Sequence, residues 1–307
     1  MVIPLSSTTA QQSTPTVVLI HGLDANKGTW HGILHDLHSA SYPAIAFDLR
    51  GHGDSPLGDP AEFSAAAVAE DVVAAIQACG SRLPAVLVGH SMGGRVAARV
   101  AAVDAQRSRA GARPLLAACV IVDMDLRVRH PPWSADADLS EPQLAALGSF
   151  ASENGQRFGS WEEARDALLP WYAEDPGSGS DQWVDSWKGK QVRPAPSGGW
   201  WSDLNPLGRR LAFRSLLETA DGLDAWDVLA RERPLRFEVH VWRAERQSGC
   251  RDEGEGGLLD MRARLPELHV RVFGGSAHSI HWSNREEFAA ALRGVVDGAA
   301  SRLRAGS

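Results

Sequence analysis

The sequence predicts an α/β fold in which a mostly parallel sheet is covered by helices on both faces. Between residues 16 and 123, short apolar runs alternate with longer stretches of helical spacing, which is the pattern of βαβ units. The runs are continuously apolar, as expected for strands buried on both faces. The pentapeptide GHSMG at residues 89–93 joins one of these runs to a helix-forming stretch.

The predicted elements of the first half follow one another in a regular order. At most one short edge strand, around residues 2–5, precedes them. The strands are expected at residues 16–20, 43–47, 84–88 and 115–122. The helices between them are expected at residues 30–39, 63–79 and 95–103.

The alternation stops after residue 125. Residues 130–230 hold no strand-like run, and seven of the chain's eleven tryptophans lie between residues 133 and 201. Amphipathic spacing predicts helices at residues 141–153, 161–172, 181–188 and 206–219. We interpret residues 130–230 as a helical, tryptophan-rich cap inserted into a core made of residues 1–129 and 231–307.

The sheet pattern returns near the C-terminus. Residues 235–242 alternate between apolar and polar, as a strand near a sheet edge does, and residues 269–273 form the last predicted strand. Helices are expected at residues 258–265 and 286–303. A polar loop at residues 243–257 connects the strand at 235–242 to the helix at 258–265.

Composition excludes several classes of function. The net charge is −7 and no long basic run is present, which argues against nucleic-acid binding. The three cysteines are far apart, so neither a disulfide framework nor a metal site is expected. The start of the chain lacks a signal-peptide pattern, and no apolar run reaches the roughly 18 residues that span a bilayer. We therefore expect a cytoplasmic enzyme, and the sequence leaves its oligomeric state open.

Ser91 is the candidate nucleophile. A Gly-x-Ser-x-Gly turn between a strand and a helix forces its serine into a strained conformation, so small neighbours such as Gly89 and Gly93 are needed. The serine then lies at a helix N-terminus, where free N–H groups and the positive end of the dipole favour a developing oxyanion.

A serine hydroxyl needs a general base, and His278 is the best candidate. It lies in a glycine-rich loop after the last strand, and site residues of parallel sheets gather at the carboxyl ends of strands. Its late position also suits the order serine, acid, histidine. His281 is the fallback.

The acid that holds the histidine is harder to assign. The loop after the penultimate strand is its usual place, but residues 243–249 contain no aspartate. Asp123, at the end of the strand that follows the helix of the GHSMG turn, is our preferred candidate. Glu245, Asp125 and Asp252 remain alternatives, and Asp123 has a second interpretation as a structural acid that caps a loop.

The oxyanion hole requires two converging backbone N–H groups. One is expected from Met92, which follows the nucleophile, and the other from Leu23, after the first strong strand. His21 is expected to order this loop by hydrogen bonding.

Three motifs together carry a resemblance to a known fold: HGL at residues 21–23, DLRGHGDSP at 48–56 and GHSMGG at 89–94. The sequence resembles α/β-hydrolase-fold proteins, and most of all their small esterase/thioesterase group. The resemblance implies cleavage of carboxylic esters or acyl thioesters of small molecules, without a cofactor. The tryptophan-rich cap suggests an apolar or aromatic substrate. Two departures from that group are the long cap and the missing aspartate at residues 243–249.

Other chemistries on this fold remain open. A serine at the nucleophile position argues against dehalogenases and epoxide hydrolases, which resemble this fold but use aspartate there. A cofactor-free ring-cleaving dioxygenase or a C–C bond hydrolase would use the same three residue types on an aromatic substrate. A third possibility is a non-catalytic receptor or scaffold.

Overall fold

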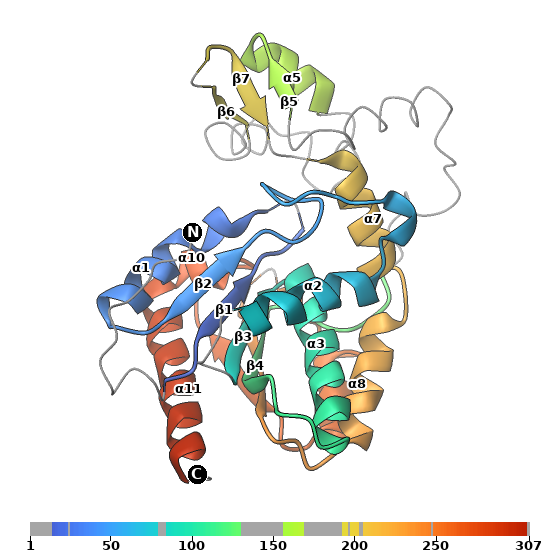
Figure 1. Cartoon of the computed structure of the whole chain (residues 1–307), viewed down its shortest axis with the longest axis vertical. Coiled ribbons are helices and arrows are strands. Elements are labelled where there is room, and N and C mark those ends of the chain that lie inside the picture. The colour runs from blue at the N-terminus through green and yellow to red at the C-terminus, as the bar shows by residue number, and fades with distance from the viewer. Residues whose placement is uncertain are drawn as a thin grey trace.

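The computed structural model describes residues 14–23, 25–78, 84–129, 156–168, 192–195, 197–202, 205–246 and 248–305. Its centre is a six-stranded sheet with the order β2-β1-β3-β4-β8-β9, in which every neighbouring pair is parallel (Figure 1). The strands are β1 (Val17–Ile20), β2 (Ala44–Phe47), β3 (Ala85–His90), β4 (Leu116–Val122), β8 (Glu238–Ala244) and β9 (His269–Phe273). The predicted sheet is thus confirmed, whereas the strand expected at residues 2–5 lies outside the described residues.

Two apolar clusters cover the two faces of the sheet. Successive side chains of a strand point to opposite faces, so Val17 of β1 belongs to one cluster and Val18 to the other. Helices α1 (His31–Ser39) and α11 (Arg285–Ala305) cover one face. On the other face lie α2 (Ala65–Ala78), α3 (Met92–Arg109) and α8 (Asp221–Arg231), which Figure 1 labels, together with α9 (Leu258–Arg264). Shorter helical segments are α10 (Ile280–Ser283) and two 3₁₀ turns, Lys27–Trp30 and Pro60–Glu62.

The cap segment is not helical throughout, which corrects the prediction. Its described residues include a small antiparallel sheet with the order β5-β7-β6, which Figure 1 shows apart from the main sheet. The strands are β5 (Gln156–Phe158), β6 (Val192–Pro194) and β7 (Trp200–Ser202). Strands of three residues are too short to show a period of two, so the sequence did not reveal them.

Two of the four predicted cap helices are present among the described residues. They are α5 (Trp161–Leu168), which reaches the last described residue of its segment, and α7 (Pro206–Leu216), which ends before the predicted bound at residue 219. Helix α7 starts at the expected residue for two local reasons. Proline stands at its first position, and the side chain of Asn205 caps it by accepting a hydrogen bond from the Gly208 N–H. The helices expected at residues 141–153 and 181–188 lie outside the described residues.

Helix α8 (Asp221–Arg231) packs in the core, whereas the cap is predicted to extend to residue 230. It packs along α3, where Arg99 and Asp221 form an ion pair of 2.6 Å. Its buried Trp226 donates an indole N–H to the carbonyl of Met261. An amphipathic helix suits either layer, so its sequence could not decide where the core resumes.

No helix among the described residues has both the length and the apolar character required to cross a bilayer.

Candidate active site

Ser91 occupies a strained turn between β3 and α3. Its φ is 53° and its ψ is −124°, a conformation that L-residues rarely adopt. A Cβ atom on Gly89 would lie 2.0 Å from the carbonyl oxygen of Gly93, and one on Gly93 would lie 2.4 Å from that of His21. The turn therefore closes only with glycine at both positions, as the sequence pattern predicted.

The side chains of Ser91, His278 and Asp123 form a hydrogen-bonded line. The Nε2 atom of His278 lies 3.0 Å from the Oγ atom of Ser91, and its Nδ1 atom lies 2.7 Å from Oδ2 of Asp123. A carboxylate only accepts, so Nδ1 carries the proton and Nε2 is free to accept from the serine. The three residues follow β3, β4 and β9, whose carboxyl ends meet at this edge of the sheet.

Asp123 is fully buried, and its carboxylate accepts from three further donors. These are the Ala244 N–H at 2.7 Å, the Ser248 hydroxyl at 2.6 Å and the Gly249 N–H at 2.8 Å. Burial alone would raise the pKa of Asp123, but the hydrogen bonds from His278, Ser248 and the two backbone groups hold it below its usual value. Asp123 is therefore held as a carboxylate beside the histidine.

The other acids considered from the sequence have other partners. Glu245 accepts from the Gly275 N–H at 2.7 Å, and Asp252 forms an ion pair with Arg243. Asp125 is buried in ion pairs with the two nearby arginines at positions 127 and 129. The structure thus brings Asp123, and none of these three, to the histidine.

His281, the fallback base, is buried and has a partner other than the serine. Its Nε2 atom lies 2.9 Å from the Thr29 hydroxyl, and burial, with a smaller effect of His278, lowers its pKa to about 3. His90 is also buried, and it donates from Nε2 to the His278 carbonyl at 3.1 Å. Burial and the neighbouring histidines His281 and His278 lower the pKa of His90 well below its ordinary value. The neutral imidazole of His90 therefore packs between the rings of His278 and His281, with centroids 4.8 and 4.7 Å away.

The loop after β1 lies against the serine. A Cβ atom on Gly22 would be 3.0 Å from Cβ of Ser91. His21 accepts from the Leu49 N–H at 3.0 Å through Nε2 and therefore donates through Nδ1 to the Gly22 carbonyl at 2.8 Å. Leu23 follows directly in the chain, and Met92 is the first residue of α3. The oxyanion hole that these two residues would form stays a prediction.

Sequence reasoning missed the residues that surround Asp123. Ser248 and Gly249 lie in the loop after β8, and no motif in the sequence marks their contact with a residue more than 120 positions earlier. Within the described residues, no group of three His, Cys, Asp or Glu side chains is placed to hold a metal ion.

Comparison with known proteins decides the family. A family model described as "Alpha/beta hydrolase family" matches residues 17–291. The chain belongs to the alpha/beta hydrolase family. Solved structures agree at the level of the fold: E-2-(acetamidomethylene)succinate hydrolase superposes with a TM-score of 0.59 and 21% identity, covering 92% of this chain and 91% of its own. A marine microorganism esterase superposes with a TM-score of 0.62 and 15% sequence identity, and the match covers 92% of this chain and 95% of the esterase.

Curated relatives of this alpha/beta hydrolase match only part of it. Lipase LipV of Mycobacterium tuberculosis is 34% identical over 153 residues, which are 50% of this chain and 54% of the lipase. The pimeloyl-[acyl-carrier protein] methyl ester esterase of Aeromonas salmonicida is 36% identical over 94 residues, 30% of this chain and 34% of the esterase. The chain thus spans about a third to a half of the length of these relatives.

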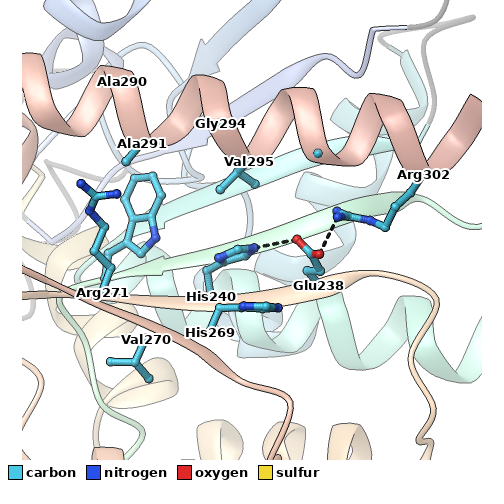
Figure 2. Close-up of a pocket in the computed structure, with 12 residues that line it drawn as sticks. Glu238, His240, His269, Val270, Arg271, Ala290, Ala291, Gly294, Val295 and Arg302 are labelled. Carbon is cyan, nitrogen blue, oxygen red and sulfur yellow. Dashed lines mark hydrogen bonds and ion pairs between the residues drawn. The ribbon is translucent and has the colours of Figure 1, made fainter.

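A separate cleft of the alpha/beta hydrolase fold lies far from Ser91 along the strands. It has a volume of about 720 Å³ and opens between α11 and the amino ends of β8 and β9. Figure 2 shows Glu238 between His240 and Arg302, both of which it contacts, while His269 stacks on His240 with ring centroids 4.7 Å apart. The hydrogen-bonded line lies at the opposite, carboxyl ends of the strands, so this cleft does not contain it.

Proposed function

We propose that this protein is a serine hydrolase that cleaves a carboxylic ester or an acyl thioester through an acyl-enzyme intermediate. The observation that carries the proposal is the line from Ser91 through His278 to Asp123, with Ser91 on a strained turn at a helix N-terminus. The relatives add support, because they are named as methyl ester esterases and a lipase.

In the first half of the reaction, the Oγ atom of Ser91 attacks the carbonyl carbon of the substrate. His278 accepts the serine proton at Nε2, and the buried carboxylate of Asp123 stabilises the imidazolium that results. The carbonyl oxygen becomes an oxyanion, which the N–H groups of Met92 and Leu23 stabilise. His278 then gives its proton to the leaving alcohol or thiol, and the acyl group remains on Ser91.

In the second half, water attacks the acyl-enzyme while His278 accepts one of its protons. Collapse of the second tetrahedral intermediate returns that proton to the Oγ atom of Ser91 and releases the carboxylic acid. No step needs a cofactor.

Ester cleavage is preferred over the other chemistries that this fold supports. A ring-cleaving dioxygenase or C–C bond hydrolase would use the same three side chains, and its support was the tryptophan-rich cap. Of the three described tryptophans of the cap sheet and helix, Trp161 and Trp200 pack on each other with ring centroids 5.7 Å apart, and Arg157 lies over Trp201. These three tryptophans therefore already contact side chains of their own segment, which weakens the support that they give to a flat aromatic substrate.

The test combines a covalent probe with a panel of substrates. A fluorophosphonate should label the wild type but not Ser91→Ala. The control variant is Ser55→Ala, which changes a serine of the 48–56 loop outside the Ser91–His278–Asp123 line and should be labelled like the wild type. Hydrolysis of short acyl p-nitrophenyl esters and acyl thioesters should fall on the order of 10⁶-fold in Ser91→Ala. Undiminished hydrolysis in that variant would refute the assignment. Labelling without hydrolysis of any ester would favour the C–C bond chemistry, and no labelling would favour a scaffold.

A further inference from the structure

The loop after β8 carries no aspartate, yet it encloses the acid of the site. Three of the four donors to the Asp123 carboxylate come from residues 244–249. We propose that Ser248 is a positioning residue, whose hydroxyl orients the Asp123 carboxylate toward His278. This proposal rests on the proposed function of the Ser91–His278–Asp123 line.

The donors are divided equally between the two carboxylate oxygens. Oδ1 accepts from the Ala244 N–H and the Ser248 hydroxyl, whereas Oδ2 accepts from the Gly249 N–H and from Nδ1 of His278. The backbone donors come from a strand end and a tight turn. The Ser248 hydroxyl is therefore the one side-chain donor, apart from the histidine, that the described residues direct at this carboxylate.

The position of the Ser248 proton follows from its partners. Its Oγ atom accepts from the Cys250 N–H at 3.0 Å, so its own proton is left to donate. Two acceptors are in reach: Oδ1 of Asp123 at 2.6 Å and the Cys250 carbonyl at 3.1 Å. A hydrogen bond to a charged oxygen is shorter and stronger than one to a neutral carbonyl, so the proton is given to Asp123.

Gly249 shows that the loop is shaped around this contact. A Cβ atom at this position would lie 2.6 Å from the Asp123 carbonyl oxygen and 2.7 Å from Cε1 of His278. Arg129 holds the other side of the turn by donating to the Gly249 carbonyl at 2.8 Å. The turn is thereby fixed against both the acid and the base, which places the Ser248 hydroxyl on the far oxygen of the carboxylate.

Removal of the hydroxyl leaves Oδ1 with the Ala244 N–H as its remaining donor. The carboxylate can then turn about its Cβ–Cγ bond, and the hydrogen bond from Oδ2 to His278 weakens. The hydrogen bond that orients the imidazole acts on the chemical step, so the loss should appear in kcat, with KM unchanged.

The test is Ser248→Ala, with Ser55→Ala as the matched control. Ser55 is also half-buried and donates its hydroxyl at 2.7 Å, but to the Asp48 carbonyl instead of the site. In ester hydrolysis, Ser248→Ala should lower kcat about tenfold, the usual scale for one hydrogen bond to a charged group. The KM should stay within about twofold, and Ser55→Ala should leave both constants unchanged.

A second background separates positioning from general destabilisation. In Asp123→Asn the carboxylate is absent, so a further Ser248→Ala change should alter kcat by less than about twofold. The positioning role is overturned if Ser248→Ala keeps more than half of the wild-type kcat. It is also overturned if Ser248→Ala lowers kcat by the same factor in the wild type and in Asp123→Asn.

An activity-independent readout keeps the two proposals distinct. The low-field proton resonance of the His278 Nδ1–H reports its hydrogen bond to Asp123, whether or not the protein hydrolyses the chosen esters. It should shift in Ser248→Ala and stay in place in Ser55→Ala. If the wild type cleaves no ester, the proposed function fails; if the resonance does not move, the role of Ser248 fails.

Discussion

Replacing Asp123 by asparagine tests the site at its buried acid. Both carboxylate oxygens accept hydrogen bonds, so the amide NH₂ group must face donors whichever way it is oriented. If it replaces Oδ2, it opposes the Gly249 N–H and leaves His278 without an acceptor for Nδ1. The imidazole then favours the tautomer with its proton on Nε2, which cannot accept the proton of Ser91.

The expected loss of activity is large, and the loss of stability is moderate. A wrong histidine tautomer at such a site lowers kcat by about 10⁴-fold, which corresponds to about 5.4 kcal/mol in the barrier. Leaving one buried N–H group without an acceptor costs about 1–3 kcal/mol of folding free energy. The side-chain volume is unchanged, so the variant should fold and bind substrate with nearly the wild-type KM.

The assay is steady-state hydrolysis of an activated acyl ester, with urea unfolding of each variant beside it. Glu245→Gln and Asp252→Asn are the matched controls, because both acids were candidates and both contact groups other than His278. Each should keep kcat within about twofold of the wild type, as is usual for surface substitutions. The reasoning is refuted if Asp123→Asn loses less than tenfold, or if either control loses as much as Asp123→Asn.

Two further predictions concern stability. Gly89→Ala should lose about 3 kcal/mol of unfolding free energy in urea, because its Cβ would lie 2.0 Å from the Gly93 carbonyl oxygen. Gly294→Ala in α11, where a Cβ meets nothing within 4 Å, should be neutral or slightly stabilising, and equal losses in both variants would contradict the argument. Stability should also fall as the pH drops below 6.5, because burial lowers the pKa of His21 and His281 to about 3 and also lowers the pKa of His90. For His21 and His281, the unfolded chain binds a proton between pH 6.5 and about 3 that the native state does not bind. Each such histidine contributes up to about 1.4 kcal/mol of unfolding free energy per pH unit in that window. In His281→Phe, the unfolding free energy measured in urea should therefore decline less steeply as the pH is lowered. A slope equal to that of the wild type would contradict this prediction.

The parallel core could be predicted from the sequence because its strands are fully buried. A strand covered on both faces, such as β3 or β4, must be apolar at nearly every position, and that is visible without a structure. The small sheet of the cap has strands of three residues, too short for any period to show. The boundary of the cap was wrong for a different reason: no helix was predicted at residues 221–231, where α8 packs on α3, and an apolar stripe fits a cap as well as a core.

The site divides in the same way. Ser91 and its glycines were predictable because the strain of the turn is local and permits few residue types. The sequence places His278 just after the last strand, and the structure puts its Nε2 atom 3.0 Å from the Oγ atom of Ser91, while its role as a base stays a prediction. The carboxylate that contacts His278 was one of four candidates from the sequence, because the distance between two residues 155 positions apart depends on the order and register of β4, β8 and β9.

By itself, the sequence determined the class of fold, the strained turn at Ser91 and the strand ends at which site residues gather. These features depend on contacts within a few residues or on burial, and both restrict which residue types a position can hold. Only the tertiary structure decided that the carboxylate beside His278 belongs to Asp123, and that Ser248 and Gly249 donate to it. Hydrogen bonds between loops distant in the chain depend on how strands align, and alignment leaves no local pattern in the sequence.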